Sequence, residues 1–413
     1  MSEAPSPIRR SVAIIGAGPA GLIAAETLAA AGHAVTVHDR MPSVGRKLLM
    51  AGRGGLNLTH SEPLAAFLER YGPAKGRLAP LIEAFPPSAL RDWAEGLDAP
   101  TFVGSSGRVF PVALKASPLL RAWLRRLDGL GVRFALRSTW AGFDETGDHR
   151  FDGPGGTSET IKADATLLAL GGASWPRLGS RGDWIDTLSA RGVPIAPLQP
   201  ANSGFRTPWS EPFRSRFAGT PLKTIAIRLD GTARRGEAMV TAYGLEGGLI
   251  YALSAQLRER IARDGSALLS VDLAPGRAGD ELAARIAAQK SGQSMSNLLR
   301  KAAHLPPVAI NLMREGAGGP LPREPERLAA LIKAVPIRLT GVEGMERAIS
   351  TAGGILWDGI DDGMMLKALP GIFVAGEMID WEAPTGGYLL QACFATGIAA
   401  AQGILARLAP ASG

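Results

Sequence analysis

The stretch that decides the fold is SVAIIGAGPAG, residues 11–21. An apolar, β-branched run is followed by three glycines in the spacing G-x-G-x-x-G, namely Gly16, Gly18 and Gly21. A helical pattern comes next, and a second apolar run, 34–37, leads to Asp39. In such a motif the first glycine makes a tight turn, the second lets the backbone approach a pyrophosphate, and the third lets the helix pack on the strand. The stretch therefore predicts a dinucleotide-binding strand–helix–strand unit.

Two further features of this unit suit a dinucleotide. The helix N-terminus offers free N–H groups and a partial positive charge to phosphates, and Asp39 can accept a hydrogen bond from a ribose hydroxyl. The residues expected to hold the cofactor here are Gly16, Gly18, Pro19, Ala20, Gly21, Asp39 and Arg40.

Composition limits the class of protein. A chain of 413 residues with 46% hydrophobic residues predicts two or three globular domains. The single cysteine, Cys393, rules out an internal disulfide and a cysteine-based zinc site, and it fits a reducing cytoplasm. The five histidines show no metal-ligand spacing, so we expect no metal. The first ten residues lack the apolar stretch of a signal peptide, and we expect the apolar run 387–409 to be a buried helix rather than a membrane span.

Positive charge is concentrated in the middle of the chain. The net charge is +7, and residues 201–340 hold 20 Lys and Arg against 12 Asp and Glu. A basic surface of this kind attracts polyanions such as RNA, although an ordinary solvated surface is the alternative interpretation.

The pattern of apolar residues predicts an α/β protein with a discontinuous nucleotide domain. Residues 1–200 and 336–413 carry the strand and glycine patterns expected of a Rossmann-like, dinucleotide-binding domain. Residues 201–278 alternate like strands and predict an inserted β-rich domain, and residues 279–335 switch to helical spacing and predict a helical subdomain.

Two segments favour FAD over NAD as the resident dinucleotide. The loop GRKLLMAGRGGLNLT, 45–59, is rich in glycine and cations and suits a phosphate or the flavin ring. The second segment, LALGG at 168–172, is a buried strand whose glycines permit close approach of the backbone. The residues expected to contact the cofactor are Arg46, Lys47, Asn57, Leu170, Gly171 and Gly172, with Arg53 as a further cation.

A third segment, residues 371–397, predicts the flavin end of the site. A strand ends in glycine, a glycine-rich turn follows, and a long helix begins near Tyr388. The positive end of that helix can stabilise the negative charge that develops on the flavin pyrimidine during reduction, and two acids can hold ribityl hydroxyls. The expected contacts are Gly376, Glu377, Asp380, Gly386, Gly387, Tyr388 and Leu389.

The chain resembles the BaiN/YhiN-like FAD-dependent flavoproteins, also known as aminoacetone-oxidase-type FAD enzymes. The resemblance is carried by GAGPAGL at 16–22, the segments 45–60 and 170–184, TAGGI at 351–355 and AGEMIDWEAPTGGYLLQACFATG at 375–397. It implies an FAD-binding Rossmann-like domain interrupted by a β-barrel-like domain and a helical subdomain. Leu56 stands where many relatives have cysteine, and Leu389 where many have asparagine.

The resemblance and the residues together predict an FAD-dependent oxidoreductase. Hydride transfer runs through flavin N5, so the protein needs to bind, orient and supply a proton; the candidates are Tyr388, Lys47 and Arg53. His60 is expected to be a hydrogen-bonded loop histidine and Cys393 a core residue, and Tyr243 and Glu246 could lie near substrate.

The expected reaction is reduction of a conjugated C=C bond. Family resemblance suggests a bile-acid-type enone or a uridine of ribosomal RNA as substrate, with NAD(P)H as electron source. The sequence has no second G-x-G-x-x-G motif after a strand, so NAD(P)H would either be a transient electron donor or not be used at all. An oxygen-dependent amine or aminoketone oxidase and an RNA-binding factor with a structural flavin remain alternatives. The sequence predicts neither membrane nor metal partners and leaves the oligomeric state open.

Overall fold

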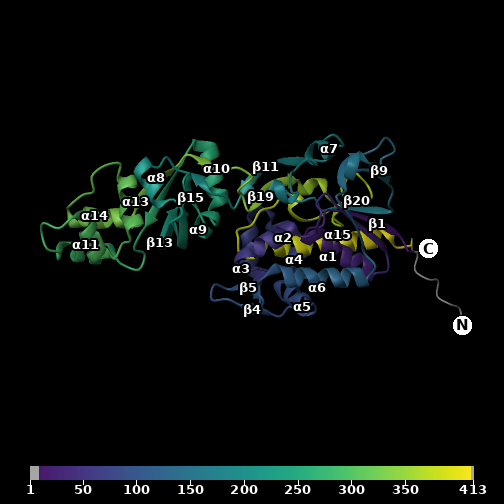
Figure 1. Cartoon of the computed structure of the whole chain (residues 1–413), viewed down its shortest axis with the longest axis horizontal. Helices are drawn as coiled ribbons and strands as arrows, with labels where there is room; N and C mark the ends of the chain where they lie inside the picture. Colours follow the sequence, from purple (N-terminus) through teal and green to yellow (C-terminus); the bar gives the residue numbers. More distant parts are fainter. Residues whose placement is uncertain (1–8, 411–413) are drawn as a thin grey trace. The chain divides into compact units, whose positions relative to one another are not determined.

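The computed structural model describes residues 9–410, apart from the side chain of Arg53. The chain forms two compact units. One runs to Gln199 and resumes at Ser350, and the other comprises Pro200–Ile349 (Figure 1).

The first unit is built on a five-stranded parallel sheet with the order β20-β10-β1-β2-β6. Its strands are β1 (Ser11–Ile15), β2 (Ala34–Asp39), β6 (Arg133–Leu136), β10 (Ala165–Leu168) and β20 (Ile372–Val374). Strand β1 lies in the middle, with Ile14 opposite Leu167 on one side and Val37 on the other. All four residues of β10 are buried, which explains their unbroken apolar sequence, as is usual for strands covered on both faces.

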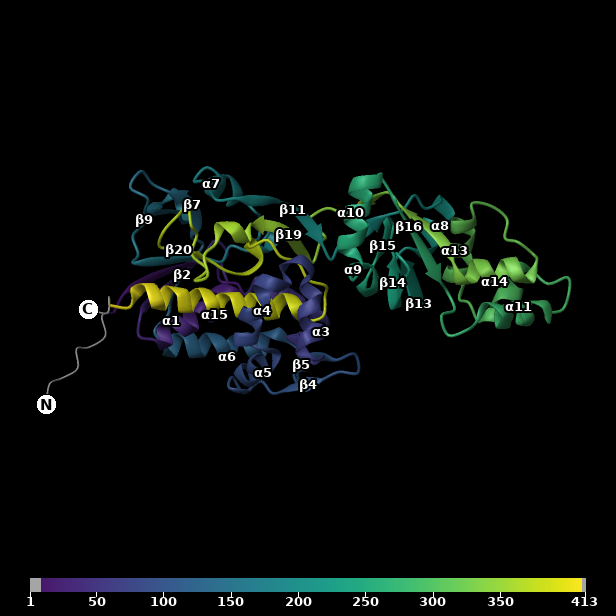
Figure 2. The ribbon, with the colours of Figure 1, turned by 180° about the vertical axis from the view of Figure 1, so that it is seen from behind.

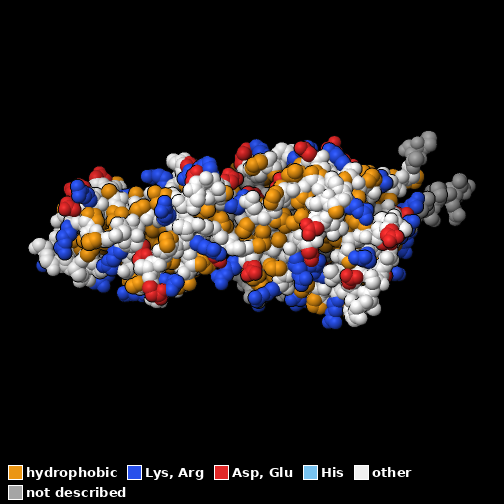
Figure 3. All heavy atoms as spheres, turned by 90° about the horizontal axis from the view of Figure 1, so that it is seen from above, with side chains coloured by type: hydrophobic (Ala, Val, Ile, Leu, Met, Phe, Trp, Pro, Cys, Tyr) orange, Lys and Arg blue, Asp and Glu red, His pale blue; other side chains and the backbone are white. Residues whose placement is uncertain are grey.

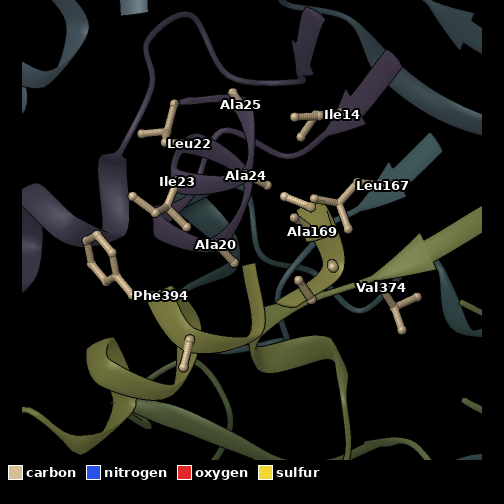
Figure 4. Close-up of a cluster of buried hydrophobic side chains, with 14 of the residues drawn as sticks. Ile14, Ala20, Leu22, Ile23, Ala24, Ala25, Leu167, Ala169, Val374 and Phe394 are labelled. Carbon is tan, nitrogen blue, oxygen red and sulfur yellow. The ribbon is translucent and has the colours of Figure 1, made fainter. Parts of the chain in front are cut away.

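Two helices form a close-packed layer beside this sheet. Helix α1 (Pro19–Ala30) and helix α15 (Tyr388–Leu408) run alongside one another in both ribbon views (Figure 2). A Cβ on Gly397 would lie 2.4 Å from the carbonyl oxygen of Ala20, so only glycine lets the helices approach this closely. Figure 4 shows Ile23 of α1 beside Phe394 of α15.

Helix α15 also has the length and hydropathy of a membrane span, the only such helix in the described part of the chain. Half of its apolar stretch is buried within this unit, including Phe394, Ala400 and Ile404. Core helices of globular units are buried in the same way, and the sequence predicted a buried helix for residues 387–409.

Smaller elements surround this core. The helices are α2 (Arg46–Ala51), α3 (Leu64–Leu68), α4 (Lys75–Ala84), α5 (Pro87–Glu95), α6 (Ala116–Gly129) and α7 (Ile185–Ser189). Two three-stranded antiparallel sheets contain β3 (Thr59–His60), β4 (Thr101–Val103) and β5 (Arg108–Pro111), and β7 (Thr139–Phe143), β8 (His149–Asp152) and β9 (Ser158–Ile161). Strand β11 (Ile195–Ala201) pairs with β19 (Ser350–Ile355).

The second unit is built on a seven-stranded sheet with the order β17-β16-β13-β14-β15-β12-β18. Its strands are β12 (Phe205–Arg206), β13 (Pro221–Leu229), β14 (Thr232–Val240), β15 (Gly244–Glu246), β16 (Ala267–Asp272), β17 (Val335–Leu339) and β18 (Gly341–Val342). The two edge strands, β17 and β18, are separated in the chain by Thr340 alone. The edges must therefore approach one another, which curls the sheet in the barrel-like manner expected.

The helices of this unit share one core with the sheet. They are α8 (Glu211–Phe217), α9 (Gly248–Tyr251), α10 (Ser254–Asp264), α11 (Gly279–Ala287), α12 (Met295–Ala303), α13 (Pro307–Ala317) and α14 (Pro325–Lys333). Leu282 of α11, Leu312 of α13 and Leu328 of α14 belong to the same buried cluster as the strands. The sequence prediction placed a boundary at 335/336 and separated 201–278 from 279–335. The structure differs because β17 and β18 extend the sheet, so the second unit runs to Ile349 as one body.

Candidate functional site

The turn between β1 and α1 has the geometry that its glycines require. Gly16 has a φ of +114°, and a Cβ there would lie 2.2 Å from the carbonyl oxygen of Ala169. A Cβ on Gly21 would lie 2.0 Å from the carbonyl oxygen of Gly16. Both positions therefore exclude any side chain for reasons internal to the protein.

Gly18 differs from these two glycines. Its φ of −84° and ψ of 179° suit any residue, and a Cβ there would have no heavy atom within 4 Å. The protein itself thus gives no steric reason for glycine at the N-cap of α1. The open space lies beside the unpaired N–H groups of a helix N-terminus, so it fits a phosphate group whose approach a side chain would block.

Asp39 ends β2 next to this turn. Its carboxylate accepts hydrogen bonds from the backbone N–H groups of Ala17 and Met41, each at 2.8 Å. Burial raises the pKa of Asp39, while these two bonds and the neighbouring arginines act in the opposite direction. Each carboxylate oxygen retains a second lone pair, so Asp39 can both fix the turn and accept from a ribose hydroxyl.

Two arginines that the sequence assigned to the cofactor have different surroundings. Arg40 makes a bidentate ion pair with Asp183, at 2.5 and 3.0 Å, so its guanidinium is already occupied by a protein carboxylate. Arg46 donates to Ser43 at 3.2 Å, and its Nε is buried without a partner. Arg46 is therefore the better placed of the two to contact a bound anion.

An ion pair joins the second and third predicted segments. Nζ of Lys47, on α2, lies 2.7 Å from Oε2 of Glu377 and 2.8 Å from Oγ of Ser174. The other carboxylate oxygen of Glu377 accepts the backbone N–H of Thr351 at 2.9 Å. Four segments that are distant in sequence thus meet at one partly buried cluster.

The glycine pair after β10 packs against the same cluster. A Cβ on Gly172 would lie 2.3 Å from Oγ1 of Thr351, and Gly171 has a φ of +71°. The Gly171 carbonyl accepts a hydrogen bond from Nε1 of Trp184 at 2.9 Å. Leu170 is half-buried and packs against the core. These contacts explain the glycines by packing, without requiring a cofactor.

Asn57 provides an independent sign of a ligand. Its Oδ1 atom is buried and has no hydrogen-bond partner in the protein. A buried acceptor without a donor is rare in folded proteins and is usually satisfied by water or a ligand. With the open space at Gly18, this atom shows that the residues present fit a large polar cofactor such as FAD. The Arg53 side chain, also predicted here, lies outside the described residues.

The start of α15 has the expected glycine turn. Gly387, the N-cap, has a φ of +97°, and a Cβ there would lie 2.4 Å from Cα of Thr59. Gly386 has a φ of +142°, and Gly376, after β20, has a φ of +80°. Burial and the charge of Glu382 raise the pKa of Asp380. Leu389 packs at the edge of the core.

Tyr388 occupies the first turn of α15 and is almost fully buried. Its hydroxyl donates to Oε1 of Glu62 at 2.5 Å, and its ring stacks on His60 with a centroid separation of 5.6 Å. Glu62 in turn accepts two hydrogen bonds from Arg70, at 2.6 and 3.1 Å. Tyr71 donates to the Tyr388 carbonyl at 2.8 Å.

These groups differ in protonation. Burial and the Glu62 carboxylate raise the pKa of Tyr388, so the phenol keeps its proton at neutral pH. Burial acts to raise the pKa of Glu62, but hydrogen bonds from Arg70 and Tyr388 outweigh it and lower that pKa. Sequence reasoning missed Glu62 and Arg70, because neither belongs to a motif with a chemical signature.

The secondary candidates are also placed. His60 is a hydrogen-bonded loop residue, as predicted: its ring nitrogens contact the Ser106 carbonyl and the Glu62 N–H. Burial raises the pKa of Cys393 to about 12, as suits a core thiol. Tyr243 donates to Glu246 within the second unit. The described residues contain no cluster of His, Cys, Asp and Glu suited to a metal ion.

Comparison with known proteins identifies the family of this chain. The family profile of the HI0933-like protein Rossmann domain matches residues 10–403. The chain belongs to this family. One relative, the 3-dehydro-bile acid delta(4,6)-reductase of Clostridium scindens, is 25% identical over 94% of this chain and 97% of its own length. The ribosomal RNA dihydrouridine synthase of Escherichia coli is also 25% identical, over 95% of this chain and 97% of its own length.

Solved structures share the fold. A flavocytochrome c3 fumarate reductase matches 98% of this chain and 80% of its own, with a TM-score of 0.53 and 15% identity. A 3-ketosteroid delta1-dehydrogenase from Sterolibacterium denitrificans matches 96% of this chain and all of its own, with a TM-score of 0.51 and 12% identity. The resemblance to the BaiN/YhiN-type family is thus confirmed, and the protein is an FAD-dependent oxidoreductase with a Rossmann-like fold.

Proposed function

We propose that this protein reduces a C=C bond conjugated with a carbonyl group, using NAD(P)H as the electron source. The two full-length relatives carry names that describe such chemistry on unlike molecules, a 3-dehydro bile acid and a uridine of ribosomal RNA. Both names imply addition of two hydrogens across a double bond. FAD, when bound, supplies the hydride chemistry, and the protein's task is to bind, orient and protonate.

The observation that carries the proposal is the protonated phenol of Tyr388. Reduction of a conjugated double bond needs a proton donor, whereas amine oxidation is aided by a base that removes a proton. The Tyr388 hydroxyl is a neutral phenol whose proton is directed at the Glu62 carboxylate, so protonating a substrate requires the hydroxyl to rotate away from Glu62. Glu62 holds the hydroxyl in place, and Arg70, which is more exposed, keeps that carboxylate charged.

Other residues supply binding. The open N-terminus of α1 at Gly18 would bind the pyrophosphate of the cofactor, and Asp39 would accept a hydrogen bond from a ribose hydroxyl. The buried Oδ1 atom of Asn57 would accept a hydrogen bond from a donor group of the cofactor. Lys47, held by its ion pair with Glu377, would place a positive charge beside the cofactor. The sequence has no second G-x-G-x-x-G motif after a strand, so NAD(P)H would act as a transient visitor rather than a resident.

The test is product analysis with substrates of both kinds. Protein pre-reduced by NADPH without oxygen is mixed with a 4-en-3-one steroid or a uridine-containing RNA, and the products are examined by mass spectrometry. We expect one of them to gain two hydrogens as the oxidised-flavin absorbance returns. Peroxide release from a small amine, with no effect of nicotinamide, would instead establish the oxidase. A flavin that responds neither to NADPH nor to a small amine would indicate that the flavin is a structural group.

A further inference from the structure

The outward face of the sheet in the second unit carries several exposed arginines. On β13, β16 and β17 the inward residues Ile227, Val271 and Val335 lie opposite one another and are buried. Because side chains alternate along a strand, their neighbours project from the other face. Arg228 and Ser270, which are partners across β13 and β16, lie on this outward face.

Three arginines lie along a diagonal of this face. Arg338 on β17 is paired with Leu268 on β16, two residues before Ser270, the partner of Arg228. Arg235 on β14 is paired with Ala226, two residues before Arg228 on β13. With about 4.8 Å between strands and about 3.4 Å per residue, the steps are about 12 Å and about 8 Å. The line therefore spans roughly 20 Å.

These guanidinium groups are not neutralised by neighbouring acids. Within the described chain, Arg228 and Arg338 make no hydrogen bond or ion pair with a side chain, and Arg235 donates only to the Pro275 carbonyl. All three are exposed. The acids near the three arginines are Glu237, Asp272 and, in the turn after β13, Asp230. Asp272 is already paired with Lys333 at 2.6 Å and Asp230 with Arg260. Among the described residues, Glu237 makes no ion pair with the three arginines.

The chemistry of the face distinguishes between polyanions. Guanidinium groups bind phosphates through paired N–H donors. Leu268, 60% exposed, is the one large apolar side chain among the exposed hydrophobic residues of these four strands, too little to enter a membrane surface. The four strands contain no aromatic residue on which a base could stack. Contacts of this kind position a nucleic acid without reading its sequence.

We propose that the diagonal of Arg228, Arg235 and Arg338 binds the phosphate backbone of RNA. This inference rests on the proposed function, since RNA is the substrate that would present a uracil ring. Figure 3 shows Lys and Arg side chains distributed over the visible face of both units with acids among them. The proposed site is identified from the strand register.

The experiment compares two triple variants. In the first, Arg228, Arg235 and Arg338 are changed to Glu; in the matched control, Arg300, Arg323 and Arg327 are changed to Glu, which alters the charge equally on exposed residues of the helical part. Binding of a fluorescein-labelled, single-stranded RNA of mixed sequence is measured by anisotropy over a range of salt concentrations. FAD content, melting temperature and flavin reduction by NADPH are measured on each protein.

We expect the wild-type protein and the control to bind with a steep salt dependence. The sheet variant should bind at least about tenfold more weakly, and the slope of log Kd against log salt should fall by about 2, near 0.7 for each phosphate that is no longer neutralised. FAD content and melting temperature should not change. An uracil-free RNA should bind equally well.

The inference is overturned if the wild-type protein does not bind RNA at low salt, if the sheet variant keeps its affinity, or if both variants lose it equally. Binding to anionic phospholipid vesicles but not to RNA would also overturn it. Failure of the proposed function has a different signature: NADPH would not reduce the flavin, while RNA binding would still depend on the three arginines.

Discussion

Replacing Gly18 by valine separates cofactor binding from folding. A Cβ at Gly18 meets no protein atom within 4 Å, and the backbone angles there are open to any residue. The valine side chain would therefore project into the open space that we assign to the pyrophosphate. We expect a folded protein that has lost its FAD.

The magnitude follows from the contacts at the start of α1. A hydrogen bond from a backbone N–H to a charged phosphate contributes roughly 1.5–3 kcal/mol. Losing two such bonds would cost about 3–6 kcal/mol, which raises the Kd for FAD by roughly 10²–10⁴-fold. Exchanging glycine for valine at an N-cap should cost at most about 1 kcal/mol of stability.

The assay is the ratio of flavin to protein after purification, together with thermal unfolding of the protein without cofactor. Gly21→Val is the matched control, because its Cβ would lie 2.0 Å from a backbone carbonyl oxygen. That variant should fold poorly, whereas Gly18→Val should unfold at nearly the temperature of the cofactor-free wild type. A yellow Gly18→Val protein would refute the placement of the pyrophosphate, and a misfolded one would refute the claim that the space is open.

Three other perturbations test separate parts of the structure. Burial lowers the pKa of His38 from 6.5 to about 4, so the free energy of unfolding should fall by about 3 kcal/mol as the pH drops through that interval. His38→Phe should remove this part of the pH dependence in urea titrations. An unchanged pH profile would contradict the lowered pKa of His38. Tyr388→Phe should slow product formation by roughly 10²-fold or more while NADPH still reduces the flavin at the wild-type rate; Tyr71→Phe, which loses only a bond to a backbone carbonyl, should leave product formation nearly unchanged. Lys47→Met should destabilise the protein by roughly 1–3 kcal/mol because it leaves the Glu377 carboxylate partly buried and unpaired; the double variant with Glu377→Gln should recover part of that loss, and a strictly additive result would show that the pair is not coupled.

The first strand–helix–strand unit could be predicted because its determinants are local. The turn glycines, the helix between them and Gly32, and the acid at the end of β2 lie within one short stretch of sequence. The predicted roles of Gly16 and Gly21 agree with the close approaches that their absent side chains permit. The long apolar run after Gly387 was likewise predicted to be a buried helix, and α15 begins at Tyr388.

Features that depend on distant partners could not be predicted. Arg40 was assigned to the cofactor, but Asp183, 143 residues further on, pairs with it. Residues 336–349 were assigned to the nucleotide domain by their strand-like pattern, yet β17 pairs with β16 in the other unit. A strand pattern in the sequence predicts that a segment is a strand but not which strand it pairs with. The boundary predicted at 335/336 therefore differs from the one in the structure.

The residues that hold the Tyr388 hydroxyl could not be predicted from the sequence either. Glu62 and Arg70 flank α3 and are of residue types that are common on protein surfaces. Only the fold brings them to the start of α15, 326 residues from Glu62 in the chain. A residue that acts by holding another leaves no motif, and its role becomes visible from geometry alone.

The measurement that tests the central claim most directly is the visible absorbance of the purified protein under anaerobic conditions, before and after NADPH or NADH is added. Our account predicts a flavin spectrum that bleaches rapidly with one of the two nicotinamides, with no other substrate present. A flavin that stays oxidised with both, but bleaches with a small amine, would contradict the reductase and establish an oxidase.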